Sequence, residues 1–137
     1  MTAPPAPTRR ALAGPASVAA LTLAAGAVLS LRDPRSSSYF PCPIHALTGF
    51  WCPGCGATRA FGALVRGDIP AAVSSNVLAV VVAVIGVVMW AMWARARARD
   101  RPLTLRRPSY WVVGSAAATV VLFTVFRNIP AGSWLAP

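Results

Sequence analysis

The chain has 137 residues, a length that suits a single domain, and 56% of them are apolar. It carries three acidic and 13 basic residues, a net charge of +10, and the charges stand between long apolar segments. This distribution argues against a soluble amphipathic domain. Since no basic stripe is interleaved with aromatic side chains, it also argues against nucleic-acid binding. It predicts an all-α integral membrane protein whose first partner is the lipid bilayer.

The N-terminal part predicts a tail and a first span. Residues 1–8 contain three prolines and no apolar stripe, so residues 1–10 are expected to form a disordered tail. Residues 11–31 carry no charge, and a helix of that length covers the ~30 Å hydrocarbon core. The competing hypothesis is a secretory signal cleaved near residues 25–27. We favour a retained span because the apolar run continues to Leu31.

The next stretch is predicted to be a loop at the membrane surface. Residues 32–38 are polar, and prolines and glycines between residues 41 and 56 rule out a long regular helix. Aromatic residues in this stretch are of the types that settle at the membrane–water boundary. A short interfacial helix should follow from about residue 57 to 65 or 66, so that loop and helix together occupy residues 39–66. Gly67 should end that helix and Asp68 should cap the next one.

Two further spans are predicted, over residues 70–94 and 110–127. Their apolar runs, residues 77–93 and 110–126, are each 17 residues long, which is the short limit for crossing a bilayer, and uncharged neighbours extend both runs. The fold class is therefore three transmembrane helices plus a short interfacial helix after a cysteine-containing loop. One helical membrane domain covers residues 11–131, and residues 132–137 form a tail.

The arginines predict the orientation of these spans, because basic residues collect in cytoplasmic connections. The expected cytoplasmic side carries Arg9, Arg10, Arg95, Arg97, Arg99, Arg101, Arg106 and Arg107, and the other side carries Arg32, Arg35, Arg59, Arg66 and Arg127. This bias predicts a multi-pass protein of the cell membrane, with its N-terminus in the cytoplasm and its cysteine loop and C-terminus outside.

Cys42, Cys52 and Cys55 are the only cysteines, and on an external face their thiols are exposed to oxidation. Residues 51–55 locally look like the active turn of thioredoxin-type oxidoreductases with the middle pair reversed, but no βαβ pattern accompanies them. Cys55 precedes a helix N-terminus, which favours its thiolate. A structural disulfide is the preferred hypothesis, and thiol–disulfide exchange with Cys42 as the resolving cysteine is an alternative.

Zinc binding is the third hypothesis for this loop. Cys42, His45, Cys52 and Cys55 supply four zinc-type ligands in two pairs, each with a two-residue gap. The pairs are separated by only six residues, which is shorter than most zinc folds use. We therefore expect His45 to be an interfacial polar residue, and we prefer no cofactor over zinc.

One set of residues resembles a known family. It comprises Cys42-Pro43, Ala46-Leu47-Thr48-Gly49, Cys52-Pro53-Gly54-Cys55-Gly56-Ala57-Thr58-Arg59-Ala60, Leu64-Val65-Arg66-Gly67-Asp68, Asn76 and Arg127-Asn128. The chain resembles, over about residues 39–130, the bacterial membrane protein family called domain-of-unknown-function family 2752. The resemblance implies a small helical membrane protein with recurring cysteines between hydrophobic helices and a motif that includes Pro53, Gly54, Gly56, Thr58 and Arg59. It implies no activity and no required histidine at the place of His45.

Polar residues are expected to gather beneath the cysteine turn. Asn76, Arg127 and Asn128 should lie at the same membrane depth as Arg59, where unpaired polar groups are costly. They predict a polar niche that would suit an anionic group such as a lipid phosphate. The alternative is that the arginines reach toward water and the two asparagines cap helices.

Classical catalysis has little support in the sequence, because no carboxylate pair, Ser-His-Asp set or phosphate-binding glycine loop can be assembled. We therefore expect a non-enzymatic membrane component that serves a lipid, a membrane protein partner or a second copy of itself.

Overall fold

The computed structural model describes residues 9–31, 42–104 and 107–136, and this part of the chain contains helices and no strand. The elements in order are α1 (Arg9–Leu31), α2 (Pro43–Thr48), α3 (Ala57–Val65), α4 (Ile69–Ala98), α5 (Tyr110–Phe126) and the 3₁₀ helix η1 (Pro130–Leu135). The predicted all-α class is confirmed for these residues. Helix α1 begins at Arg9, so residues 9 and 10 belong to this helix and not to the expected tail at residues 1–10. Residues 1–8 lie outside the described part of the chain.

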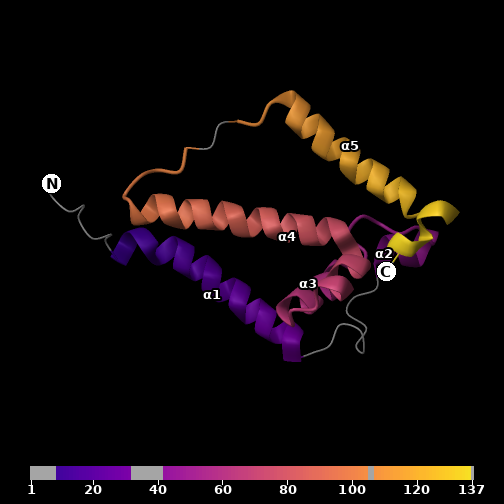
Figure 1. The fold of residues 1–137 in the computed structure, drawn as a ribbon, viewed down its shortest axis with the longest axis horizontal. Coiled ribbons are helices and arrows are strands. Elements are labelled where there is room, and N and C mark those ends of the chain that lie inside the picture. Colours follow the sequence, from indigo (N-terminus) through magenta and orange to yellow (C-terminus); the bar gives the residue numbers. More distant parts are fainter. Residues whose placement is uncertain (1–8, 32–41, 105–106, 137) are drawn as a thin grey trace.

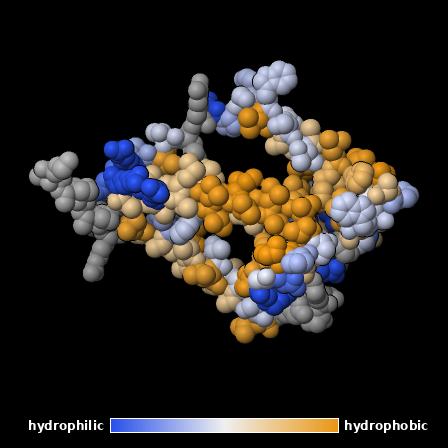
Figure 2. Space-filling model, in the orientation of Figure 1, coloured by the Kyte–Doolittle hydropathy of each residue, from blue (hydrophilic) through white to orange (hydrophobic). Residues whose placement is uncertain are grey.

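In the described part of the chain, two helices are long and apolar enough to cross a membrane: Leu12–Leu31 within α1, and Ile69–Ala98, which is α4. The third predicted span, α5, is a shorter apolar helix of 17 residues. Apolar surface gathers over α4 in the space-filling view (Figure 2). Exposed valines and isoleucine in the middle of α4, namely Val81, Val82, Val84, Ile85, Val87 and Val88, contribute to it.

Helices α1 and α4 run in opposite directions, meet near the start of α1 and diverge toward its end, where α3 lies between them (Figure 1). At the meeting point, the Trp90 indole Nε1 donates to the Pro15 carbonyl over 3.0 Å. Gly14 allows this approach, because a Cβ there would lie 3.2 Å from the Trp93 ring. At the other end of α1, a Cβ on Gly26 would lie 3.3 Å from Val65 of α3.

Local capping chemistry sets the ends of α3 and α4. Gly56 precedes α3 with a φ of 83° and Gly67 follows it with a φ of 76°, conformations that glycine adopts without strain. The Asp68 carboxylate then accepts the Ala71 N–H over 3.0 Å, which is the predicted cap of α4. The expected helix over residues 57 to 65 or 66 is therefore confirmed, and α4 extends the expected span at both ends.

The backbone of α4 is broken at Asn76, whose φ of −169° and ψ of 98° are not helical. Such a break removes ladder hydrogen bonds and needs replacement partners. The Asn76 Oδ1 supplies one of them, because it accepts the Ala79 N–H over 2.9 Å and so caps the remainder of α4.

The end of the chain does not form the expected tail at residues 132–137. Pro130 opens η1, which packs against α4 and α5, and residue 137 lies outside the described part. Gly132 permits the fold-back, because a Cβ there would lie 1.9 Å from the Phe126 carbonyl oxygen. This turn brings the C-terminal segment close to the cysteine loop.

Candidate functional site

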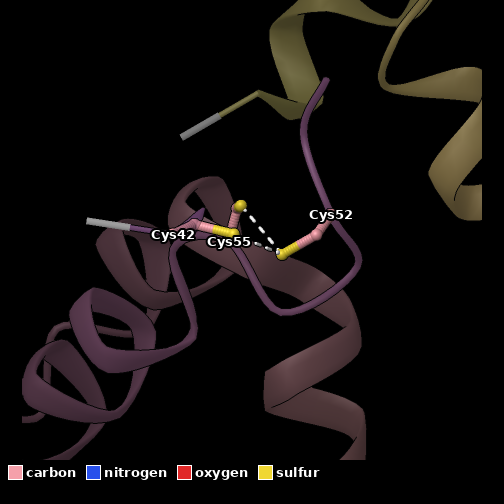
Figure 3. Close-up of side chains that lie close together, drawn as sticks. All are labelled: Cys42, Cys52 and Cys55. Atoms are coloured by element: carbon pink, nitrogen blue, oxygen red, sulfur yellow. Dashed lines mark hydrogen bonds between the residues drawn. The ribbon is translucent and has the colours of Figure 1, made fainter. Parts of the chain in front are cut away.

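The three cysteines form one cluster, although each comes from a different part of the loop (Figure 3). The Cys52 sulfur lies 3.3 Å from that of Cys42 and 2.9 Å from that of Cys55, and all three sulfurs lie within 4.8 Å of one another. All three are free thiols, since a disulfide requires a separation of about 2.0 Å. The predicted disulfide therefore stays a prediction.

Two short elements place these sulfurs. Cys42 is the N-terminal cap of α2, a six-residue helix that starts with Pro43 and ends at Gly49 in the left-handed conformation. Cys52 and Cys55 flank a tight turn in which the Cys55 N–H donates to the Cys52 carbonyl over 3.1 Å. Pro53 and Gly54 suit the middle of such a turn, because proline fixes φ and glycine tolerates unusual conformations.

Asn76 binds the turn from α4, in the gap that the helix break creates. Its side chain is 1% exposed. The amide Nδ2 donates to the carbonyls of Pro53 and Cys55, each over 2.9 Å, while the oxygen caps α4 as described above. All polar positions of this buried amide are therefore used, as buried polar groups require.

Arg127 binds the same turn from the end of α5, and it too is 1% exposed. Its Nη1 donates to the carbonyls of Cys52 and Cys55 over 3.1 and 3.3 Å, and its Nη2 donates to those of Cys55 and Leu135 over 3.3 and 3.1 Å. The guanidinium also lies 4.9 Å from the centre of the Phe123 ring. Burial lowers the pKa of Arg127, and the neighbouring Cys55 and Cys52 oppose that shift.

Asn128 completes this set by pairing with the backbone of Trp51. Its Oδ1 accepts the Trp51 N–H over 2.8 Å, and its Nδ2 donates to the Trp51 carbonyl over 2.9 Å. We call Asn76, Arg127 and Asn128 the turn clamp. The structure thus brings together the three residues expected beneath the turn, and all of them bind backbone groups.

Arg59 and Thr58 lie outside the turn clamp, exposed on α3. Of the two arginines of the expected niche, Arg127 binds the turn through its Nη groups, whereas Arg59 is exposed on α3. The anionic lipid site stays a prediction.

The His45 imidazole is not part of the sulfur cluster, although the His45 backbone hydrogen-bonds Cys42. Its ring stacks on Trp51 at a centroid distance of 3.7 Å and an angle of 17°, and its Nδ1 is buried with no hydrogen-bond partner among the described residues. Of the four ligands considered for zinc, the group that could hold a metal contains the three cysteines.

The three thiols differ in acidity. A hydrogen bond from the His45 backbone, with further bonds to Cys52 and Cys55, lowers the pKa of Cys42 to about 7. Burial, with contributions from Cys52 and Cys42, raises the pKa of Cys55 to about 12. At neutral pH a substantial share of Cys42 is thiolate, whereas Cys55 stays protonated in the metal-free reduced protein.

This difference predicts the order of alkylation. In reduced, metal-free protein at pH 7, iodoacetamide should modify Cys42 at least about tenfold faster than Cys55, because the thiolate is the nucleophile and Cys55 is buried. Lowering the pH from 8 to 6 should slow Cys42, since its thiolate is lost as the pH falls through 7. Peptide mass spectrometry over time measures both rates. Equal rates at the two cysteines would contradict the prediction.

The sequence alone did not indicate α2, the break at Asn76 or the role of Leu135. A local signal for α2 exists, because Cys42-Pro43 with Gly49 has the form of a capped helix. Pro130 with Gly132 likewise has the form of a turn and indicates the start of η1. The link between Arg127 and Leu135 has no local signal.

A comparison with protein families gives a match to part of the chain. No curated protein and no solved structure matches the chain. Residues 42–90 match the model of a family described as a protein of unknown function, DUF2752. The match covers the cysteine cluster, α2, α3 and the first part of α4 with Asn76, and it ends before Arg127 and Asn128. It confirms, through residues 42–90, the resemblance to domain-of-unknown-function family 2752.

Proposed function

We propose that this chain is an integral membrane protein that holds a soft metal ion, of the zinc type, between Cys42, Cys52 and Cys55. The observation that carries the proposal is the presence of a third sulfur in the same cluster. A structural disulfide uses two sulfurs and gives no reason for a third within 4.8 Å. Thiolate groups are the ligands that zinc and other soft ions prefer.

The sulfur separations fit a shared ion. Bonds of about 2.3 Å arranged tetrahedrally around zinc place two sulfurs about 3.8 Å apart. Two separations in the cluster, 2.9 and 3.3 Å, are shorter than that value by less than about 1 Å, and the third is below 4.8 Å. Small side-chain rotations at Cys42 and Cys52, which are both partly exposed, would equalise them.

The turn clamp supports the same proposal. Because Asn76 and Arg127 fix the carbonyls of the turn from two different helices, the sulfurs of Cys52 and Cys55 are held in a defined arrangement. Second-sphere bonds of this kind commonly orient metal ligands. Three thiolates leave a fourth position on zinc for water or for a group from a partner.

We propose the membrane orientation from the arginine bias, with the N-terminus in the cytoplasm and the cluster at the external face. The helices α1 and α4 would span the bilayer, and α5 would be a third, short span. In this orientation the cluster lies near the membrane surface, where a lipid, a membrane protein partner or a second copy of the chain could reach it.

A titration of the purified protein in detergent tests the function. Reduced protein should bind one Zn²⁺ per chain in competition with a chromophoric chelator. Co²⁺ should give the near-ultraviolet charge-transfer bands of cobalt–thiolate bonds. Bound zinc should also protect all three cysteines from alkylation, while Arg59→Gln protein, altered at an exposed site, should behave like wild type. Three reactive thiols in the presence of zinc would refute the proposal, and a reductant-sensitive bond between two of them would favour the structural disulfide.

A second function is favoured by the contrast in thiol acidity, because a low pKa at Cys42 beside a high pKa at Cys55 is typical of thiol–disulfide exchange. The sulfur positions do not favour it. Exchange needs three sulfurs in a nearly straight line, whereas the angle at Cys52 can be little more than a right angle when the outer pair lies within 4.8 Å. A mixed disulfide trapped on a Cys55→Ser variant would support exchange over metal binding.

A further inference from the structure

We infer that Arg127 is the counter-charge of this centre, and that the centre is therefore a divalent ion on three thiolates. This inference rests on the proposed metal function and adds a charge requirement to it. Arg127 would act through Cys52 and Cys55 rather than by touching the ion, so it is a positioning residue.

The first step is that the Arg127 charge is buried without a carboxylate. Its side chain is 1% exposed, and each of its four hydrogen bonds ends on a neutral backbone carbonyl. Two acidic residues lie in the described chain: Asp68 binds the start of α4, and Asp100 follows the opposite end of that helix. An unpaired buried cation is expensive, so a negative charge is expected nearby.

The second step is that the cysteine cluster is where that negative charge can form. Arg127 donates to the carbonyls of two of the three cluster residues, which fixes the guanidinium against the turn that carries their sulfurs. The Arg127 Nε is buried and has no hydrogen-bond partner among the described residues, so it also lacks a carboxylate there. Among the described residues, the thiols are the remaining groups beside Arg127 that can become anionic.

The third step is a charge count. A divalent ion bound by three thiolates carries one net negative charge, and the Arg127 guanidinium makes the buried unit neutral. A monovalent ion on three thiolates would leave a negative charge uncompensated, and three protonated thiols would leave the arginine uncompensated. For an ion bound by all three sulfurs as thiolates, neutrality therefore requires a divalent charge.

Charge-changing variants of Arg127 test this inference with two probes. Zn²⁺ forms the charged complex. Phenylarsine oxide condenses with two thiols, releasing water and forming two arsenic–sulfur bonds in a neutral product. Arg127→Gln should weaken Zn²⁺ binding on the order of tenfold or more, the scale of a charge interaction across several Å at an effective dielectric constant of ~20. It should change phenylarsine oxide binding by less than about twofold, because that product has no charge to balance.

Two further variants separate charge from structure. Arg127→Lys keeps the charge but not the guanidinium's fork of donors. If the charge is what the centre needs, this variant should bind Zn²⁺ within about threefold of wild type, and the comparison stands even if the glutamine variant does not fold. Arg59→Gln removes an exposed arginine from α3 and should leave both affinities unchanged. Equal losses of Zn²⁺ and arsenical binding in Arg127→Gln, or a tenfold loss of Zn²⁺ binding in Arg127→Lys, would overturn the inference. If wild-type protein bound no Zn²⁺, the proposed function itself would fail.

Discussion

Cys52→Ser is expected to lower the affinity for Zn²⁺ by more than about a hundredfold, the largest effect expected of any substitution discussed for the cluster. Outer-sphere changes alone cost 10- to 100-fold, and this change removes a ligand. Cys52 is also the sulfur closest to both others, at 3.3 and 2.9 Å. Chelator competition measures the affinity, and alkylation should show that Cys42 and Cys55 lose their zinc-dependent protection.

The matched control is Ser74→Ala, which alters an exposed hydroxyl on α4 that bonds only to its own helix at Ala71. This variant should bind Zn²⁺ with wild-type affinity. If Cys52→Ser retained wild-type affinity, the ion would not be held by the cluster, and the observation that supports the metal function would lose its force.

Asn76→Ala is expected to lower the free energy of unfolding by about 3 kcal/mol, because buried groups left without partners cost about 1–3 kcal/mol each. Asn76 makes three bonds from a site that is 1% exposed: two to the turn carbonyls and one from the Ala79 N–H. A change in denaturation midpoint, followed by circular dichroism in detergent, measures the loss.

Zinc affinity should fall along with stability in Asn76→Ala, since the same bonds position the carbonyls of Pro53 and Cys55. In the control Ser74→Ala, the free energy of unfolding should change by less than about 0.5 kcal/mol, as is usual for exposed sites. An Asn76→Ala variant as stable as wild type would show that water or lipid satisfies the broken part of α4.

The sequence predicted those parts of the molecule whose causes are local. The bounds of α3 follow from glycines at both ends and the start of α4 follows from Asp68, and each of these signals acts within a few residues. The length of the apolar runs likewise predicted α1 and α4.

The remaining features depend on contacts between distant residues. At the break in α4, the Asn76 amide donates hydrogen bonds to carbonyls 21 and 23 residues earlier in the chain. The Arg127 guanidinium donates to carbonyls 72 and 75 residues earlier. His45 matched the spacing of a zinc ligand, yet its ring stacks on Trp51, a contact that spacing alone does not reveal. The polar residues near apolar segments therefore indicated where the site lies. Their hydrogen-bond and stacking partners could be found only in the folded structure.

The attachment of α5 gives the molecule a mechanical property. Helix α5 packs on η1 at its C-terminal end and runs away from α4 along the rest of its length (Figure 1). Because α5 is held at one end, a sideways force on its other end would rotate the helix about the held end. Arg127 directly follows Phe126 at the held end, and its Nη groups donate to the cysteine turn. Tilting of α5 about this end would therefore move the Arg127 guanidinium relative to the turn that carries Cys52 and Cys55.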